Sequence, residues 1–282
     1  DVVLRFLEST GRPSEARLYL DLFRARPREQ FAAIAVDANV MADAEDAVLQ
    51  DLRFLAALDL FPVVVLGVFQ PAEALDHARS LRRRVQAEGL HAAELRARRR
   101  SFTTRVTASA RSGAVPVVVF EPRGDEAPAE RLDRLGALLR ELHARKLLFL
   151  HRPGGLRQGG ALVPIVNLST DAPALLASGE LSRKEALILE GARRLCEAAA
   201  PLPFTVAVTS PLNLLRELFT VKGAGTLLRR GARVVRHAGW EGVDVARVRG
   251  LLASSFGRAP AEAVCARTPS RVWLDEGDRG CV

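Results

Sequence analysis

Several residue types that often signal a function are scarce in this sequence. The three cysteines are odd in number and lack metal-ligand spacing, which excludes a disulfide framework and favours a reducing compartment. The five histidines are dispersed, so the sequence predicts no metal site. There is no uninterrupted run of about 18 apolar residues, and the first residues lack the pattern of a signal peptide. We therefore expect a cytoplasmic protein with no membrane partner.

Lysine and aromatic residues are also rare, and this bears on the excess of positive charge. Only three of the 41 basic residues are lysines, and the arginines behind the net charge of +8 are spread along the whole chain. The one dense cluster, ELRARRRSFTTR at 94–105, could follow a phosphate backbone. However, aromatic residues make up only 5% of the chain, and no stacking platform is interleaved with the charge. We predict a solvated helix face there and no nucleic-acid partner.

The sequence does contain a regular alternation of strand-like and helix-like segments. Short apolar runs are separated by longer stretches with helical periodicity. Because the runs show no polar alternation, we expect the sheet to be buried on both faces, and the spacers are long enough for crossover helices. This predicts an α/β fold with a doubly wound, mainly parallel sheet. The strand-like runs lie at 31–38, 62–67, 115–121, 146–151 and 204–210.

Two segments depart from this alternation within or before the main domain. GLRQGGALVPIVNL, between residues 155 and 168, predicts a hairpin around Gly159-Gly160 that lies beside the main sheet. The opening residues have helical patterns that are broken at Gly11-Arg12-Pro13. We therefore expect residues 1–26 to form a separate N-terminal helical segment.

The pattern changes again near residue 237. A helix-like stretch at 243–257 is followed by a strand-like run at 271–276. So few elements cannot bury a core of their own, so this part either docks on the main domain or begins a second one. We place the main domain at 27–238 and the second, partial domain at 239–282.

The segment LLRELFTVKGAGTLLRRG, at 214–231, joins a helix-like run to a Gly-x-Gly turn and a strand-like run. Gly223 follows a helix, whereas the glycines of dinucleotide fingerprints precede one, so we interpret it as a helix C′ residue with positive φ. Glu217 lies in the last turn of the helix, where the dipole disfavours a carboxylate by roughly 0.3–1 kcal/mol. Such a charge needs a cation, which Arg216 or another local arginine could supply.

This segment resembles the closing signature of the N-acetylglutamate kinase and N-acetylglutamate synthase families. Four earlier segments of the chain occur in the same order as in those families: EARLYLDLF, PVVVLG, KLLFLHRPGGL and VNLSTD. The resemblance implies the amino acid kinase fold, a three-layer sandwich around a mainly parallel sheet. Past residue 240 the chain is similar to the opening of the acetyltransferase domain, of α+β type, in the synthases of vertebrate and bifunctional type.

Active kinases of the resembled family carry a lysine and paired glycines after the first strand, and three glycines after the second. This sequence has Ala35-Val36-Asp37-Ala38 and Gly67-Val68-Phe69 at those places. Asp37 and Ala38, with Gly67 and Phe69, are thus degenerate nucleotide loops, and DEAPAERLDRLG replaces a kinase Asn-x-Asn-x-Asp stretch. Each missing donor would cost roughly 10²–10³ in rate, so the resemblance implies a pseudokinase without catalytic residues. An active N-acetylglutamate kinase remains the alternative if the loops are misplaced.

The resemblance also implies an effector, because arginine-sensitive members bind free L-arginine between the N-terminal helix and the 214–231 segment. By this resemblance Glu217 meets the guanidinium, Gly223 gives backbone contacts, Tyr19 closes the site and Lys222 meets the effector's carboxylate. Phe204 stands where kinases tend to place a histidine that lines this site. Phe204 is equally well explained as the first core residue of its strand.

Acetyl transfer is not expected from these residues alone. Acetyltransferases hold the pyrophosphate of acetyl-CoA on a Gly-rich turn at a helix N-terminus, and nothing after residue 240 fits that pattern. The resemblance therefore assigns acetyl-CoA to the rest of an amino-acid N-acetyltransferase, and this chain needs no cofactor. It implies an arginine-sensing module that forms homo-oligomers. A non-enzymatic scaffold without any effector is the second alternative.

Overall fold

The computed structural model of the chain has two compact units, which divide between Arg230 and Gly231. The first unit holds the α/β fold, and the second holds a two-stranded sheet. None of the described helices is long and apolar enough to cross a membrane. The structure describes residues 13–25, 27–28, 31–97, 102–198, 204–220, 223–231, 234–241, 243–246, 248–249 and 272–275.

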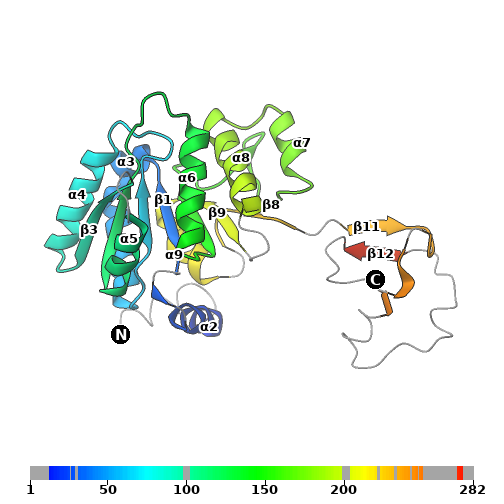
Figure 1. The fold of residues 1–282 in the computed structure, drawn as a ribbon, viewed down its shortest axis with the longest axis horizontal. Coiled ribbons are helices and arrows are strands. Elements are labelled where there is room, and N and C mark those ends of the chain that lie inside the picture. The colour runs from blue at the N-terminus through cyan, green and yellow to red at the C-terminus, as the bar shows by residue number, and fades with distance from the viewer. Residues whose placement is uncertain are drawn as a thin grey trace. The chain divides into compact units, whose positions relative to one another are not determined.

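An eight-stranded sheet forms the centre of the first unit, with the order β3-β4-β2-β1-β5-β9-β10-β8 (Figure 1). Every neighbouring pair is parallel except β9 and β10. The mainly parallel, doubly wound sheet predicted from the apolar runs is therefore confirmed. The strands are β1 (Ala33–Val36), β2 (Val63–Leu66), β3 (His91–Arg96), β4 (Ala114–Val119), β5 (Lys146–Leu150), β8 (Ile165–Asn167), β9 (Thr205–Thr209) and β10 (Thr226–Arg229).

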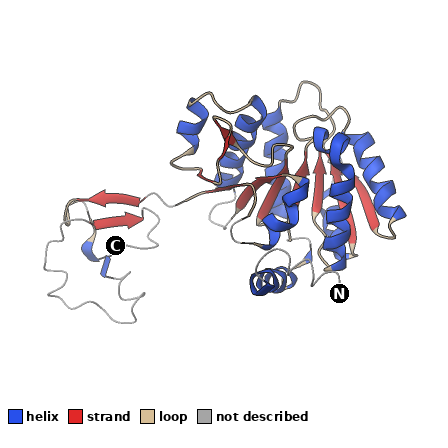
Figure 2. Cartoon of the chain, turned by 180° about the vertical axis from the view of Figure 1, so that it is seen from behind, coloured by secondary structure: helices blue, strands red, loops and turns tan. Residues whose placement is uncertain are grey.

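Helices cover both faces of this sheet, so the unit is a three-layer sandwich (Figure 2). Each face has its own cluster of buried apolar side chains, because successive residues of a strand point to opposite faces. One face carries α2 (Pro13–Arg24), α3 (Ala38–Ala57), α4 (Ala74–Ala87) and α9 (Leu214–Phe219). The other carries α5 (Phe102–Arg111), α6 (Pro128–Glu141), α7 (Ala172–Ala177) and α8 (Arg183–Ala198).

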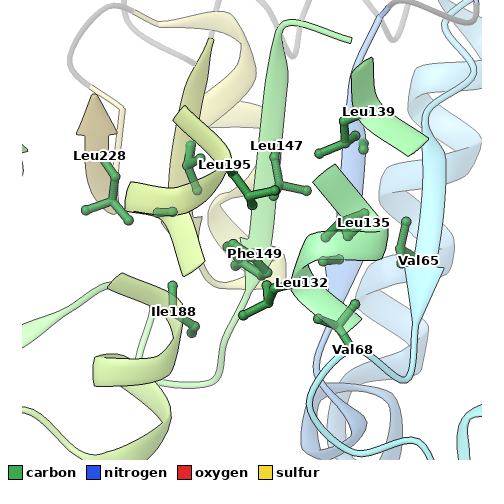
Figure 3. Close-up of a cluster of buried hydrophobic side chains, with 14 of the residues drawn as sticks. Val65, Val68, Leu132, Leu135, Leu139, Leu147, Phe149, Ile188, Leu195 and Leu228 are labelled. Atoms are coloured by element: carbon green, nitrogen blue, oxygen red, sulfur yellow. The ribbon is translucent and has the colours of Figure 1, made fainter. Parts of the chain in front are cut away.

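The apolar cluster on the face that carries α6 and α8 shows how the helices pack on the sheet. Figure 3 shows Leu132 and Leu135 of α6 and Ile188 of α8 gathered around Phe149 of β5. Each such side chain contributes about 1.5–3 kcal/mol by leaving water. The two helices pack closely because glycine faces leucine between them: a Cβ on Gly191 would lie only 2.6 Å from Leu132 Cδ1. This packing fixes the first turn of α8 over the end of the sheet.

The predicted hairpin around Gly159-Gly160 is confirmed. β6 (Arg157–Gln158) and β7 (Ala161–Leu162) pair antiparallel as a small sheet of their own. The helical prediction for the N-terminal segment is confirmed for α2, whereas residues 1–12 lie outside the described residues.

The prediction of a solvated helix face at 94–105 is wrong in its first part. Residues 91–96 form β3, an edge strand that pairs in parallel with β4. The helix α5 starts only at Phe102, and residues 98–101 lie outside the described part of the chain. The strand was not predicted because its sequence has few apolar residues. As an edge strand, β3 has a single fully buried position, Leu95, so its other positions can carry charged side chains.

In the second unit, β11 (Val234–His237) pairs antiparallel with β12 (Val272–Asp275). The strand predicted at 271–276 is thus confirmed, while most of the helix predicted at 243–257 falls outside the described residues. The domain boundary between residues 238 and 239 stays a prediction. The pairing links 234–237 to the C-terminal segment rather than to the main sheet.

Asp51 of α3 makes the stability of the first unit depend on pH. Its side chain is buried, its Oδ2 has no hydrogen-bond partner among the described residues, and burial raises the pKa of Asp51 to about 8 from 3.8. The folded chain therefore keeps a proton that the unfolded chain releases, so stability falls as pH rises from about 4 to about 8. Asp51→Asn should raise the free energy of unfolding at pH 8 by about 1–3 kcal/mol, measured by urea denaturation.

The same change should leave stability at pH 4 nearly unaltered, because Asp51 is then protonated in the folded state. Asp133→Asn, on the exposed side of α6, is the matched control and should change neither value. A pH dependence in Asp51→Asn as steep as that of the wild type would contradict the buried, neutral Asp51.

Candidate functional site

The strand order reverses between β1 and β5, and this point is where open α/β sheets bind ligands. The strand that follows β1 in the sequence, β2, pairs with it on one side, and β5 pairs with it on the other. Parallel pairing sets Val36 beside Leu150 at the carboxyl ends of the two strands. The next residues, Asp37 and His151, are therefore neighbours at the end of the sheet, and Asp37 N–H donates to the Leu150 carbonyl at 3.2 Å.

The side chains at this point form a connected polar group. Lys184 Nζ, from the first turn of α8, donates to Asp37 Oδ1 at 2.9 Å and to Oδ2 at 2.7 Å. His151 Nδ1 lies 3.4 Å from Asp37 Oδ2. The exposed fractions are 4% for the Asp37 side chain, 9% for His151 and 22% for Lys184, so the ion pair lies almost out of water.

The charges in this group are mutually dependent. Burial alone would raise the pKa of Asp37, but the hydrogen bonds and charges of His151 and Lys184 outweigh it and hold the pKa below 3.8. His151 Nε2 is buried and has no hydrogen-bond partner among the described residues. The group is thus a carboxylate paired to an ammonium, with one unused imidazole nitrogen beside it.

The space next to this group is small. Asp37, His151 and Lys184 line a cavity of about 10 Å³ together with Phe69 and Phe149, among others. That volume is at the lower limit of what holds one water molecule. A phosphoryl group does not fit there unless side chains move.

The first of the two predicted nucleotide loops is not a loop in the structure. β1 ends at Val36 and α3 begins at Ala38, so Asp37 alone connects them. Asp37 has the N-cap position of α3, yet its side chain makes no capping hydrogen bond. Ala38, half-buried, is the first helical residue. The chain has no room here for a glycine-rich turn that could wrap a phosphate.

The second predicted loop, Gly67-Val68-Phe69, does follow a strand. Gly67 has φ +85°, and a Cβ on it would lie 2.4 Å from the Phe120 carbonyl oxygen, so only glycine fits. Arg131 Nε donates to the Val68 carbonyl at 2.7 Å. The Phe69 ring lies 5.5 Å from that of Phe149. The Val68 carbonyl and the Phe69 ring are therefore both in contact with other parts of the protein.

A second candidate site surrounds Glu217, a residue of α9 that is only 5% exposed. Its Oε2 accepts hydrogen bonds from the N–H groups of Ala224 at 2.9 Å and Gly225 at 3.3 Å. Lys146 Nζ donates to the Glu217 carbonyl at 2.8 Å, and burial lowers the pKa of Lys146 against the opposing charge of Glu217. Backbone donors, rather than Arg216, thus satisfy this oxygen.

The prediction that Gly223 is the C′ residue of the helix is wrong, although its positive φ is confirmed at +60°. The helix ends at Phe219, and Thr220 turns to an extended conformation, where its Oγ1 accepts a hydrogen bond from Gly223 N–H at 3.1 Å. A Cβ on Gly223 would lie 2.4 Å from Glu217 Oε2. Glycine is therefore needed both for φ and for the approach of the carboxylate.

The structure also brings the N-terminal helix to this region. Phe23 of α2 lies edge-on to Phe219 of α9, with ring centroids 5.7 Å apart. Half-buried Tyr19, one turn earlier on α2, lies 6.0 Å from Phe23. The predicted effector residues Tyr19, Glu217 and Gly223 thus share one part of the fold, while Lys222 lies outside the described residues. Their role in binding stays a prediction.

Sequence reasoning missed Lys184, His151 and Lys146. The signal was the scarcity of lysine itself: in a chain that uses arginine almost everywhere, two of the three lysines form hydrogen bonds at the two candidate sites. Lysine has a compact ammonium that both positions can enclose, whereas the planar guanidinium needs a wider site.

Lys184→Met tests the ion pair, because it leaves the Asp37 carboxylate nearly buried without its cation. We expect a loss of about 3 kcal/mol in the free energy of unfolding at pH 7, measured by urea denaturation. Since the pKa of Asp37 is lowered in the folded state, the pair stabilises above about pH 3.8, and the effect should fade as pH drops below that value. Arg152→Met, which breaks the exposed pair with Asp43, should cost under about 1 kcal/mol. Equal losses for both would contradict a buried pair.

Proteins with known names resemble the chain over almost its whole length, although no protein-family model matches it. A protein from Xanthomonas campestris pv. campestris named acetylglutamate kinase is 28% identical over 95% of this chain and 75% of its own length. The mitochondrial N-acetylglutamate synthase of Danio rerio is 28% identical over 98% of this chain, and that of Homo sapiens is 27% identical over 96%. The chain spans 61% and 59% of these two synthases.

Solved structures share the fold at lower identity. N-acetylglutamate synthase from Neisseria gonorrhoeae, complexed with coenzyme A and N-acetyl-glutamate, matches with a TM-score of 0.67 at 16% identity, over 94% of this chain and 74% of that one. UMP kinase from Bacillus anthracis matches with a TM-score of 0.53 at 11% identity, over 73% and 98%. The chain is therefore similar in sequence to proteins named acetylglutamate kinase and N-acetylglutamate synthase, and it has the amino acid kinase-like fold.

Proposed function

We propose that the chain is the kinase-like part of an N-acetylglutamate synthase, which has lost phosphoryl transfer and instead senses L-arginine and holds subunits in an oligomer. Acetyl transfer from acetyl-CoA to glutamate belongs, in this proposal, to the rest of the protein. The observation that carries it is the closure of the crevice between β1 and β5 by Asp37 and Lys184.

Phosphoryl transfer depends on cations and N–H donors placed around the phosphates. Here the nearest ammonium, on Lys184, is neutralised by Asp37, and β1 leads into α3 through that single residue. The Asp37 carboxylate would repel the phosphates of a nucleotide, and it also pairs with the Lys184 ammonium that could otherwise bind them. Both features support the loss of kinase activity.

Purified protein should therefore show no ATP-dependent phosphorylation of N-acetylglutamate above background. A coupled assay for ADP release measures this, with the Xanthomonas campestris relative as the positive control. Turnover that requires N-acetylglutamate would instead establish the alternative function, an active N-acetylglutamate kinase, which the names of several relatives favour.

The arginine site rests on the packing of α2 against α9. A guanidinium pairs with a carboxylate through charge-assisted hydrogen bonds, which are stronger away from water, and Glu217 is only 5% exposed. Since its Oε2 already accepts two backbone hydrogen bonds, we assign Oε1 to the guanidinium. A further N-acetylglutamate synthase structure from Neisseria gonorrhoeae, complexed with coenzyme A and L-arginine, has the same fold, with a TM-score of 0.61 at 15% identity.

L-Arginine should bind the wild-type chain in isothermal titration calorimetry, and Glu217→Gln should weaken binding by about 1.5–3 kcal/mol, or roughly 10–150-fold. L-Citrulline, which replaces the guanidinium by a neutral ureido group, should bind neither protein. Glu141→Gln, on the exposed end of α6, is the matched control and should bind arginine normally.

Each outcome of this titration has a distinct meaning. No heat with arginine at millimolar concentration would favour the alternative of a scaffold without an effector. Equal affinity in wild type and Glu217→Gln would place arginine elsewhere on the protein. A ligand acts as an effector only if it binds one arrangement of the subunits more tightly, so the oligomeric state should also shift with arginine in sedimentation.

A further inference from the structure

We propose that Lys184 and His151 form a binding site for a small carboxylate-like anion, and that the chain's own Asp37 side chain is its resident ligand. The proposal deepens the loss of phosphoryl transfer proposed above, because it says what replaced the nucleotide. The test uses no nucleotide. The anion site can therefore be disproved while the loss of phosphoryl transfer stands, and the loss of phosphoryl transfer can be disproved while the anion site stands.

The conformation of Asp37 is the first argument. An aspartate at an N-cap position ordinarily accepts a hydrogen bond from the backbone of the first helical turn, worth about 1 kcal/mol. Asp37 forgoes that bond, although it stands directly before the first helical stretch of α3, which runs from Ala38 to a kink at Ala44. Its two oxygens instead take Lys184 Nζ at 2.9 and 2.7 Å. The carboxylate is thus oriented as a ligand of the ammonium rather than as a cap.

The surroundings of the carboxylate are the second argument. Its donors come from segments far apart in the sequence, His151 after β5 and Lys184 in α8, which the packing of α8 holds in place. The His151 side chain is only 9% exposed, lines the cavity, and has an Nε2 without a partner among the described residues. The Lys184 ammonium and the Nδ1 side of the His151 ring are thus held against the carboxylate by parts of the fold outside α3.

The size of the cavity is the third argument. With Asp37 in place about 10 Å³ remains, so a second anion cannot enter. Removing the carboxylate alone vacates a space the shape of one carboxylate group, beside an ammonium that has lost its counter-charge. Formate, the smallest carboxylate, should fill that space without any movement of the backbone.

Asp37→Ala with added sodium formate is the experiment. Thermal unfolding of this variant in formate should occur about 3 °C or more above that in sodium chloride of equal ionic strength, because a ligand that binds only the folded state stabilises it. The wild type should show no such difference between the two salts. Asp37→Ala with Lys184→Met should show none either, since the ammonium that holds the anion is gone.

Asp43→Ala is the matched control. It also removes a carboxylate near the start of α3, but this one pairs with Arg152 at the surface. Formate should leave its unfolding temperature unchanged relative to chloride. If Asp37→Ala does not fold in chloride, the yield of soluble protein refolded in formate against chloride becomes the measurement, and the proposal expects recovery in formate only. Equal behaviour of Asp37→Ala in both salts, or equal gains in the Lys184→Met double variant, would overturn it.

Discussion

The hydrogen-bonded ion pair between Asp37 and Lys184 is the constraint on which the rest of this site depends. It joins the end of β1 to the first turn of α8, two segments 147 residues apart in the sequence. It lies between β1 and β5, where the strand order reverses, so it occupies a place that the fold offers to a ligand. Whether a ligand can bind between β1 and β5 therefore depends on whether the Asp37–Lys184 ion pair stays formed.

A similar use of internal partners recurs at the other candidate site. Glu217 Oε2 accepts hydrogen bonds from the N–H groups of Ala224 and Gly225, and Lys146 Nζ donates to the backbone carbonyl of Glu217. In both places a charge that could have met a ligand is satisfied by the chain itself. The difference is that Glu217 keeps a second oxygen for a guanidinium in our proposal, whereas both oxygens of Asp37 are taken by Lys184.

Much of the fold was predictable because apolar runs without polar alternation, such as VVVL in β2, have few alternatives to a strand buried on both faces. The edge strand β3 was missed, since a strand buried mainly at Leu95 leaves its remaining positions free for charged residues. At the site, Asp37 and Phe69 were recognisable as departures from a resembled pattern. The rarity of lysine marks Lys184 in the sequence, but its pairing with Asp37, like that of Phe149 with Phe69, is set by tertiary packing and could not be predicted.

The central claim is that Asp37, not a nucleotide, neutralises Lys184 at the end of β1. A crystal structure of the chain grown with magnesium and a non-hydrolysable ATP analogue tests it most directly. We expect both oxygens of Asp37 to lie within about 3 Å of Lys184 Nζ, which is hydrogen-bonding range, with no phosphate density beside them. Density for the analogue's phosphates between the ends of β1 and β2, with Lys184 turned from Asp37 toward them, would contradict it.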